Sequence, residues 1–282
     1  MHPHLFSFFG VEITTYGLMV ALAFVTLWFC TVFRGKRLGF SPDFIQNLLT
    51  LIVIAAMVSA RLLYVIVYWP YFAENPGDII FSREGYVFLG GLVGGVAVAL
   101  WYTRRHKHSI LGVADLFAPY VPLAHGIGRI GCFLYGCCFG AVCSLPWAVE
   151  FPKNSPAYYA QLNSGDLASG ALHSLPVHPT QIYSVLGNWL IFAILILLQR
   201  KQQFRGQLAM GYLMLYSVIR FLIEAYRADP RGAWAGFSTS QWISLLMLAG
   251  GAIGYWLLWK RGIEPLKPQT TQETVSAQSS SD

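Results

Sequence analysis

Seven apolar stretches, each long enough to cross the hydrocarbon core of a membrane as a helix, dominate this chain of 282 residues. Charged residues make up only 11% of it, whereas a soluble domain carries about 25%. The sequence therefore predicts an all-α integral membrane protein with about seven transmembrane helices. The expected spans are 13–33, 44–69, 86–103, 111–134, 179–199, 206–227 and 239–259.

The placement of Lys and Arg orients these spans. Twelve of the 19 basic residues lie in four alternate connections: Arg34, Lys36, Arg37, Arg104, Arg105, Lys107, Arg200, Lys201, Arg205, Lys260, Arg261 and Lys267. The other connections contain only Arg83, Lys153 and Arg231. Because basic loops stay on the cytoplasmic side, we expect the N-terminus outside and the C-terminus in the cytoplasm. The same placement accounts for the net charge of +6, so no nucleic-acid partner is expected.

Two segments of the chain lie outside the predicted spans and are longer than ordinary connections. Residues 136–178 lie outside and are too many for a plain connector, so we expect them to pack as a small external cap. Residues 269–282 contain neither aromatic residues nor Leu, which predicts a disordered cytoplasmic tail. We therefore expect one seven-span domain over 1–268, followed by that tail.

Three arginines lie inside predicted spans at a matched depth. Counting about 1.5 Å per residue along each helix puts them in the outer leaflet, together with polar residues at the outer ends of the oppositely directed spans. This layer comprises Arg61, Arg129, Arg220, Tyr16, His178 and Gln181. A single arginine near a helix end often extends to the lipid headgroups. Three at one depth instead favour a cationic site for an anionic lipid headgroup, because guanidinium groups bind phosphate oxygens in pairs.

Other charged residues near this layer have predicted partners. Glu224 is one helical turn from Arg220, so an intrahelical pair is expected to orient that arginine. Arg227 follows one turn further, near the outer surface. Asp115 opens the fourth span, where compensation of that helix's N-terminal dipole is the expected role.

The run HGIGRIGCFLYGCCFG at 125–140 is the most specific stretch of the chain. Its glycines allow close helix packing, while the arginine at its centre indicates a bound anion or counter-ion. The cysteines of this region are Cys132, Cys137, Cys138 and Cys143. They are interpreted as a structural disulfide or buried thiols, with zinc binding or redox chemistry as the alternative. No C-x-x-C spacing and no adjacent His pair is present, so no metal is expected.

Taken together, these motifs resemble the bacterial phosphatidylglycerol–prolipoprotein diacylglyceryl transferases over nearly the whole chain. The matches follow the family's order: YGLM at 16–19, SARLLY around Arg61, GGLVGG at 90–95, DLFAPYVPLAHGIGRIG at 115–131, HPTQIY at 178–183, YSVIRFLIEAYR at 216–227, and Gln241. The resemblance implies an enzyme of the bacterial inner membrane. It would transfer the diacylglyceryl group of phosphatidylglycerol to the lipobox cysteine thiol of a prolipoprotein, without a cofactor, and release glycerol phosphate.

The resemblance also implies roles for individual residues. The expected catalytic residues are Arg129, Arg220, Tyr216 and Tyr16. The expected substrate-binding residues are Arg129, Arg61, Gly140, His178, Gln181 and Arg227. The arginines suit this chemistry, because cleavage of the carbon–oxygen bond places negative charge on the departing phosphate, which fixed cations stabilise.

The chain departs from the family pattern in two places. Typical members read HGGL where this chain has LGGL at 89–92, and Cys132 and Cys137 replace an asparagine and a glutamate. An imidazole titrates near neutral pH and could take a thiol proton, whereas a leucine cannot. The acceptor thiol must therefore lose its proton to the cationic field or to His125 or His178, and we expect the field.

Three other functions fit parts of the pattern. A non-catalytic carrier of anionic lipid would use the same arginines without chemistry. A paralogous transferase would act on a different acceptor or phospholipid. A thiol–disulfide membrane enzyme would use the cysteines.

Overall fold

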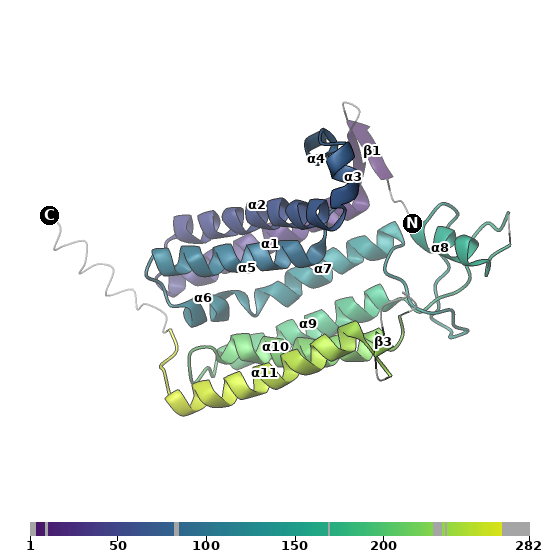
Figure 1. Cartoon of the computed structure of the whole chain (residues 1–282). Helices are drawn as coiled ribbons and strands as arrows, with labels where there is room; N and C mark the ends of the chain where they lie inside the picture. The colour runs from purple at the N-terminus through teal and green to yellow at the C-terminus, as the bar shows by residue number, and fades with distance from the viewer. Residues whose placement is uncertain are drawn as a thin grey trace. The chain divides into compact units, whose positions relative to one another are not determined.

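A computed structural model of the chain describes residues 4–8, 11–81, 85–168, 170–227, 233–234 and 236–266. These residues are mostly helical (Figure 1). The helices are α1 (Thr15–Arg37), α2 (Pro42–Val67), α3 (Trp69–Glu74), α4 (Asp78–Phe81), α5 (Phe88–Arg105), α6 (Ile110–Phe117), α7 (Tyr120–Tyr135), α8 (Pro156–Ser164), α9 (Thr180–Gln199), α10 (Gln207–Glu224) and α11 (Thr239–Arg261). Strands β1 (His4–Phe8) and β2 (Val11–Thr14) form one antiparallel pair, and β3 (Ala233–Trp234) and β4 (Phe237–Ser238) form another. The predicted tail at 269–282 lies outside the described residues, as do Arg83, Arg231 and Lys267.

All seven predicted apolar stretches are helical, the fourth as the pair α6 and α7. These two helices meet at an angle of 43°, and Pro119, which lacks a backbone N–H, stands at the N-cap of α7 where the stretch is interrupted. Among the described residues, α1, α2, α9 and α11 are long and apolar enough to cross a membrane, and the bent pair would be a fifth span. The protein is thus mainly α-helical, with four or five candidate membrane spans.

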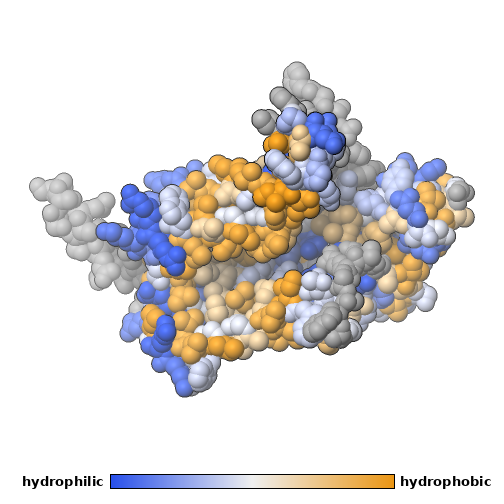
Figure 2. Space-filling model, viewed as in Figure 1, coloured by the Kyte–Doolittle hydropathy of each residue, from blue (hydrophilic) through white to orange (hydrophobic). Residues whose placement is uncertain are grey.

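The long helices expose large apolar side chains. Phe29 of α1 is 64% exposed and Leu246 of α11 is 71% exposed, and many similar residues surround them. Figure 2 shows hydrophobic residues over the sides of the helices and hydrophilic ones gathered at helix ends. An apolar surface of this extent is unfavourable in water and favourable against lipid tails. This distribution supports a multi-pass membrane protein.

The chain forms two compact units. One comprises Met1–Cys30 with Ala114–Pro265, and the other comprises Thr31–Val113 with Leu266–Asp282. In the first unit α7 packs on α9, α9 on α10, and α10 on α11 (Figure 1). The buried core of this unit contains Ala118, Ile191, Leu195, Leu208 and Ala209.

In the second unit, α2 and α5 pack along each other. A side-chain carbon at Gly90 would collide with the backbone of Ser59, and one at Gly94 would collide with the Ser59 hydroxyl. The two glycines are one helical turn apart, so together they form a flat strip on α5 on which α2 lies. The GGLVGG motif therefore serves helix packing.

The segment 136–178, in which the structure describes every residue except Ser169, has a buried core of its own. Phe151, Ala157 and Val177 are fully buried within it. Isolated bridges join Val177 to Val142 and Val149, and α8 lies across the segment. The segment thus has a buried core, while the expectation of a cap outside the membrane stays a prediction.

Asp115 has a different role from the one expected. It lies near the C-terminal end of α6 and accepts hydrogen bonds from the backbone N–H groups of Gly206 at 2.5 Å and Ala209 at 3.0 Å. The amide of Gln202 donates a third, at 2.7 Å. Gly206 is the N-cap of α10 and has no side chain to bond the first amides of that helix. Asp115 therefore caps α10 from another helix rather than compensating the dipole of its own.

Asp115→Asn should lower the free energy of unfolding by about 1–3 kcal/mol, because an amide cannot accept all three hydrogen bonds. The thermal unfolding midpoint of the detergent-solubilised protein would measure this loss. Asp43→Asn is the matched control, since Asp43 is exposed in the first turn of α2. This variant should lower the free energy of unfolding by less than about 1 kcal/mol. Equal shifts in the two variants would contradict the capping role.

Candidate functional site

Arg129 and His125 form the centre of the site on α7. The Nε of Arg129 donates a hydrogen bond of 3.2 Å to Nε2 of His125, one helical turn earlier. Both side chains are half-buried. Because a guanidinium only donates, the imidazole must accept at Nε2 and is therefore neutral, with its proton on Nδ1. The spacing of four residues on one helix brings these two side chains together.

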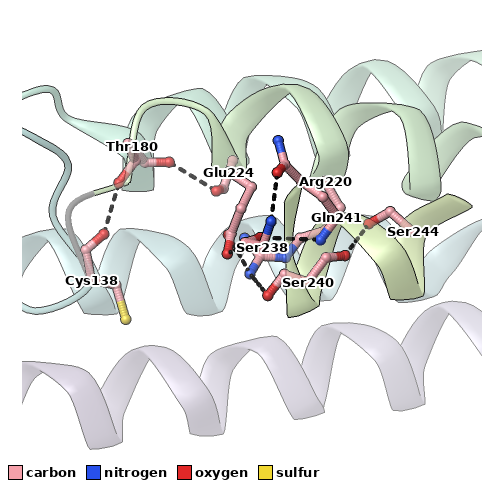
Figure 3. A network of polar contacts seen from close by, with 9 residues as sticks. Cys138, Thr180, Arg220, Glu224, Ser238, Ser240, Gln241 and Ser244 are labelled. Atoms are coloured by element: carbon pink, nitrogen blue, oxygen red, sulfur yellow. Dashed lines mark hydrogen bonds and ion pairs between the residues drawn. The ribbon is translucent and has the colours of Figure 1, made fainter. Parts of the chain in front are cut away.

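Arg220 is fixed on α10 by partners from two helices. It forms an ion pair of 2.7 Å with Glu224, as expected, and donates a 3.1 Å hydrogen bond to the hydroxyl of Ser240. The hydroxyl of Ser238 donates to Glu224 at 3.2 Å. Ser238 and Gln241 form a capping box at the start of α11 (Figure 3). The N-terminus of α11 thus holds the carboxylate that orients the arginine.

The two arginines act on the same imidazole. Both Arg129 and Arg220 are close enough to His125 to influence it electrostatically. The ring of Tyr216 on α10 lies 5.8 Å from that of His125. Asn188, almost completely buried on α9, also contacts His125. Asn188 is not among the residues expected from the sequence, although an amide inside an otherwise apolar span is a signal of function.

Tyr16 approaches the site from α1. A side-chain carbon at Gly131 would lie 3.4 Å from the Cα of Tyr16, so α1 rests closely on α7 at this glycine. The ring centroids of Tyr16 and Tyr135 are 6.3 Å apart. Tyr16 is 43% exposed and lies within electrostatic reach of Arg129. It is therefore accessible beside one of the two arginines.

Gly140 joins the loop after α7 to the ends of α9 and α10. Its N–H donates to the carbonyl of His178 at 2.9 Å, and it forms an isolated bridge with Arg227. A side-chain carbon here would lie 2.5 Å from the carbonyl oxygen of Tyr226, 2.7 Å from Cβ of His178 and 2.8 Å from Cγ2 of Thr180. Only glycine allows this approach.

His178 and Gln181 hold the same junction. Nδ1 of His178 lies 3.2 Å from the hydroxyl of Tyr183, and its ring packs 5.1 Å from that of Tyr226. Gln181 is 1% exposed, and its amide donates to the carbonyl of Cys137 at 2.7 Å. These contacts give both residues a structural role, and their contact with substrate stays a prediction.

Arg61 belongs to the second unit. Its guanidinium donates to three backbone carbonyls, those of Asp78 at 2.6 Å, Gly85 at 3.1 Å and Ile79 at 3.2 Å. It thereby ties α2 to the connection that precedes α5. Leu89, where the family pattern has histidine, lies in the first turn of α5 in the same unit and is 59% exposed.

The cysteines form no disulfide among the described residues. All five are free, and Cys132 is buried. The expected alternative of a disulfide is not observed in the part of the chain that the structure describes, and of the four cysteines in this region Cys137, Cys138 and Cys143 are only partly buried. The sulfur atoms of Cys132, Cys137 and Cys138 all lie within 4.8 Å of one another, and Cys143 is not part of this group. The absence of a C-x-x-C spacing therefore does not keep these three sulfurs apart, and the expectation of no metal stays a prediction.

Comparisons with known proteins match almost all of the chain. The model of the family described as "Prolipoprotein diacylglyceryl transferase" matches residues 3–257. Three relatives bear the name phosphatidylglycerol–prolipoprotein diacylglyceryl transferase, the second with the suffix 2. The Clostridium tetani protein is 36% identical over 89% of this chain and 95% of its own length. The Clostridium perfringens protein is 33% identical over 88% of this chain and 91% of its own length. The Bordetella avium protein is 34% identical over 87% of this chain and 90% of its own length.

Gly140→Ala should destabilise the fold by about 1–3 kcal/mol, because the backbone oxygen of Tyr226 cannot move aside for a methyl group. Gly250→Ala is the matched control, since a side-chain carbon there meets nothing within 4 Å and alanine favours the helix. Thermal unfolding in detergent would measure both. A Gly140 variant as stable as the control would show that the close approach is unimportant.

Proposed function

This chain belongs to the prolipoprotein diacylglyceryl transferase family, and from that membership we propose the reaction that it catalyses. It transfers the diacylglyceryl group of phosphatidylglycerol to the lipobox cysteine thiol of a prolipoprotein, and glycerol phosphate leaves. The names of the relatives support both substrates. The product is a thioether, formed in lipoprotein maturation.

The observation that carries this proposal is the pair of arginines, Arg129 on α7 and Arg220 on α10, that act on one half-buried imidazole. A guanidinium inside a membrane helix costs several kcal/mol unless it is paired or faces a ligand. The phosphate of phosphatidylglycerol supplies such a ligand, and each guanidinium offers it two parallel N–H groups. As the carbon–oxygen bond breaks, negative charge grows on this phosphate, and the two cations lower the barrier.

The remaining predicted residues take supporting roles in this proposal. Tyr216, whose ring lies beside that of His125, and Tyr16, within electrostatic reach of Arg129, assist catalysis. Gly140, His178 and Gln181 shape the binding region through the junction that they hold. The other proposed contacts with the lipid headgroup come from Arg61 and Arg227.

The acceptor thiol loses its proton in the cationic field rather than to His125. The Nε2 lone pair of His125 is occupied by the N–H of Arg129. A second proton on this ring would place a third positive charge beside Arg129 and Arg220, which is unfavourable. The imidazole is therefore a poor base, and its role is to position Arg129.

Arg129→Lys and Arg220→Lys should each lower the rate of transfer by roughly 10–100-fold, because an ammonium group cannot bind phosphate in a bidentate manner. Mass spectrometry of a lipobox peptide incubated with the purified protein and phosphatidylglycerol would measure the rate. Arg105→Lys is the control, since Arg105 is exposed at the end of α5 and should leave the rate unchanged. A wild-type protein that adds no diacylglyceryl mass would refute the proposed reaction and would leave a lipid carrier.

The proposed topology is a seven-span domain over 1–268 in the bacterial inner membrane, with the segment 136–178 outside and the tail 269–282 in the cytoplasm. The helices α5 and α10 then cross the membrane together with the four long helices and the bent pair. The support is the alternation of basic and non-basic connections along the chain.

Reporter fusions test this topology. An enzyme that is active only in the periplasm should be active when fused after Ser164, and inactive when fused after Arg105 or Lys201. The reason is that twelve basic residues lie on the side assigned to the cytoplasm. Activity after Lys201 would mean that one of the proposed spans does not cross.

A further inference from the structure

The three clustered cysteines are brought together by the end of α7. Cys132 lies in the last turn of the helix, and Gly136 follows in the left-handed conformation at φ 83°. The N–H groups of Gly136 and Cys137 turn back to the carbonyls of Phe133 and Cys132, at 3.2 Å and 3.1 Å. This is the Schellman arrangement, which reverses the chain. It brings Cys132 and Cys137, which are five residues apart, next to each other. The sulfurs can therefore approach one another without a C-x-x-C spacing in the sequence.

Cys138 has an unusual backbone conformation. Its φ is +61°, in the left-handed region that residues with a side chain rarely adopt. Such strain persists only where the surrounding structure imposes it, and it is concentrated at functional sites. At Cys138 it accompanies a sulfur that is within 4.8 Å of those of Cys132 and Cys137.

The loop that carries these sulfurs is fixed by hydrogen bonds from α9. The hydroxyl of Thr180 donates to the carbonyl of Cys138 at 2.8 Å (Figure 3). The amide of Gln181 donates to the carbonyl of Cys137 at 2.7 Å. Thr180 and Gln181 are each 1% exposed. Buried hydrogen bonds to both carbonyls hold the cysteine backbone in place before any ligand binds, as metal sites require.

Two arginines lie within electrostatic reach of the cysteine cluster. Arg129 and Arg227 both act on Cys138, and Arg129 also acts on Cys132. Three thiolates around a divalent cation carry a net charge of −1, which the nearby guanidinium groups offset. Zinc–sulfur bonds of about 2.3 Å place sulfurs about 3.8 Å apart in tetrahedral geometry, a spacing compatible with the observed limit.

We propose that Cys132, Cys137 and Cys138 bind a zinc ion whose fourth coordination position is open to the acceptor thiol. No fourth His, Cys, Asp or Glu joins the group in the part of the chain that the structure describes. Zinc sites with three protein ligands and an open position are typically catalytic. The identity of the fourth ligand as a substrate thiol rests on the proposed function.

A zinc ion in this site adds to the cationic field in which the acceptor thiol loses its proton. The acceptor sulfur displaces water from zinc and loses its proton to solvent, since a coordinating thiol is deprotonated. The sulfur then bonds to the glycerol carbon, and the bond from that carbon to the phosphate oxygen breaks. The electron pair leaves with glycerol phosphate, which Arg129 stabilises beside the cluster. The three cysteines gain and lose no electrons, so no oxidant is required.

Metal analysis of the full-length protein, purified in detergent without chelators, tests the site directly. We expect about one zinc per chain, reduced at least tenfold in Cys132→Ser and Cys138→Ser and unchanged in the control Cys143→Ser. Thiol counting tests the wild-type chain itself, so it does not depend on whether the variants fold. A maleimide reagent should label three additional cysteines once a chelator removes the metal. Absence of zinc, or a disulfide among the three cysteines, would overturn the proposal.

Cobalt(II) in place of zinc tests the open position. Thiolate-to-cobalt absorption should appear in the near ultraviolet, and the visible bands should shift when a lipobox peptide binds, but not with its Cys→Ser counterpart. An unchanged spectrum with the cysteine peptide would refute the open position. Transfer by a zinc-free protein would refute this inference and leave the proposed function intact. Zinc binding without transfer would refute the function and leave the metal site.

Discussion

A guanidinium inside a helical membrane protein is stable only where fixed partners replace the water that it has lost. Arg220 obtains those partners from Glu224 and from Ser240 at the start of α11, and Arg129 obtains one from His125 on its own helix. The capping box of α11 and the packing of α10 on α11 therefore stabilise the fold and also hold the guanidinium of Arg220 in position. In the proposed reaction, the phosphate of phosphatidylglycerol binds to guanidinium groups that these contacts already hold in position.

Much of the helical fold could be predicted from the sequence, because apolar runs of spanning length have few alternative structures. All seven runs are helical, and Pro119 marks the break in the fourth because proline removes a backbone donor. The pair Arg220–Glu224 followed from helical spacing alone. Asp115 did not, since the helix it caps begins far along the chain and nothing local indicates the contact.

The site was only partly predictable, because side chains from separate helices meet there. Helical spacing placed His125 beside Arg129, but Asn188 joins them through the packing of α9 on α7. The cysteine cluster was missed because motif spacing assumes an extended chain, whereas the turn at Gly136 folds Cys137 and Cys138 back on Cys132. Arg61 also donates to backbone carbonyls of the connection before α5, contacts that its depth in the span could not indicate, and its contact with lipid stays a prediction.

The bond from Asp115 to the start of α10 imposes an order on biosynthesis. Asp115 precedes Gly206 by 91 residues, so its carboxylate is synthesised before the amides of α10 that it binds. Until then the carboxylate has no backbone donors from α10, and afterwards it anchors the helix that carries Arg220 and Tyr216. The start of α10 thus binds to a residue of α6 that is synthesised earlier.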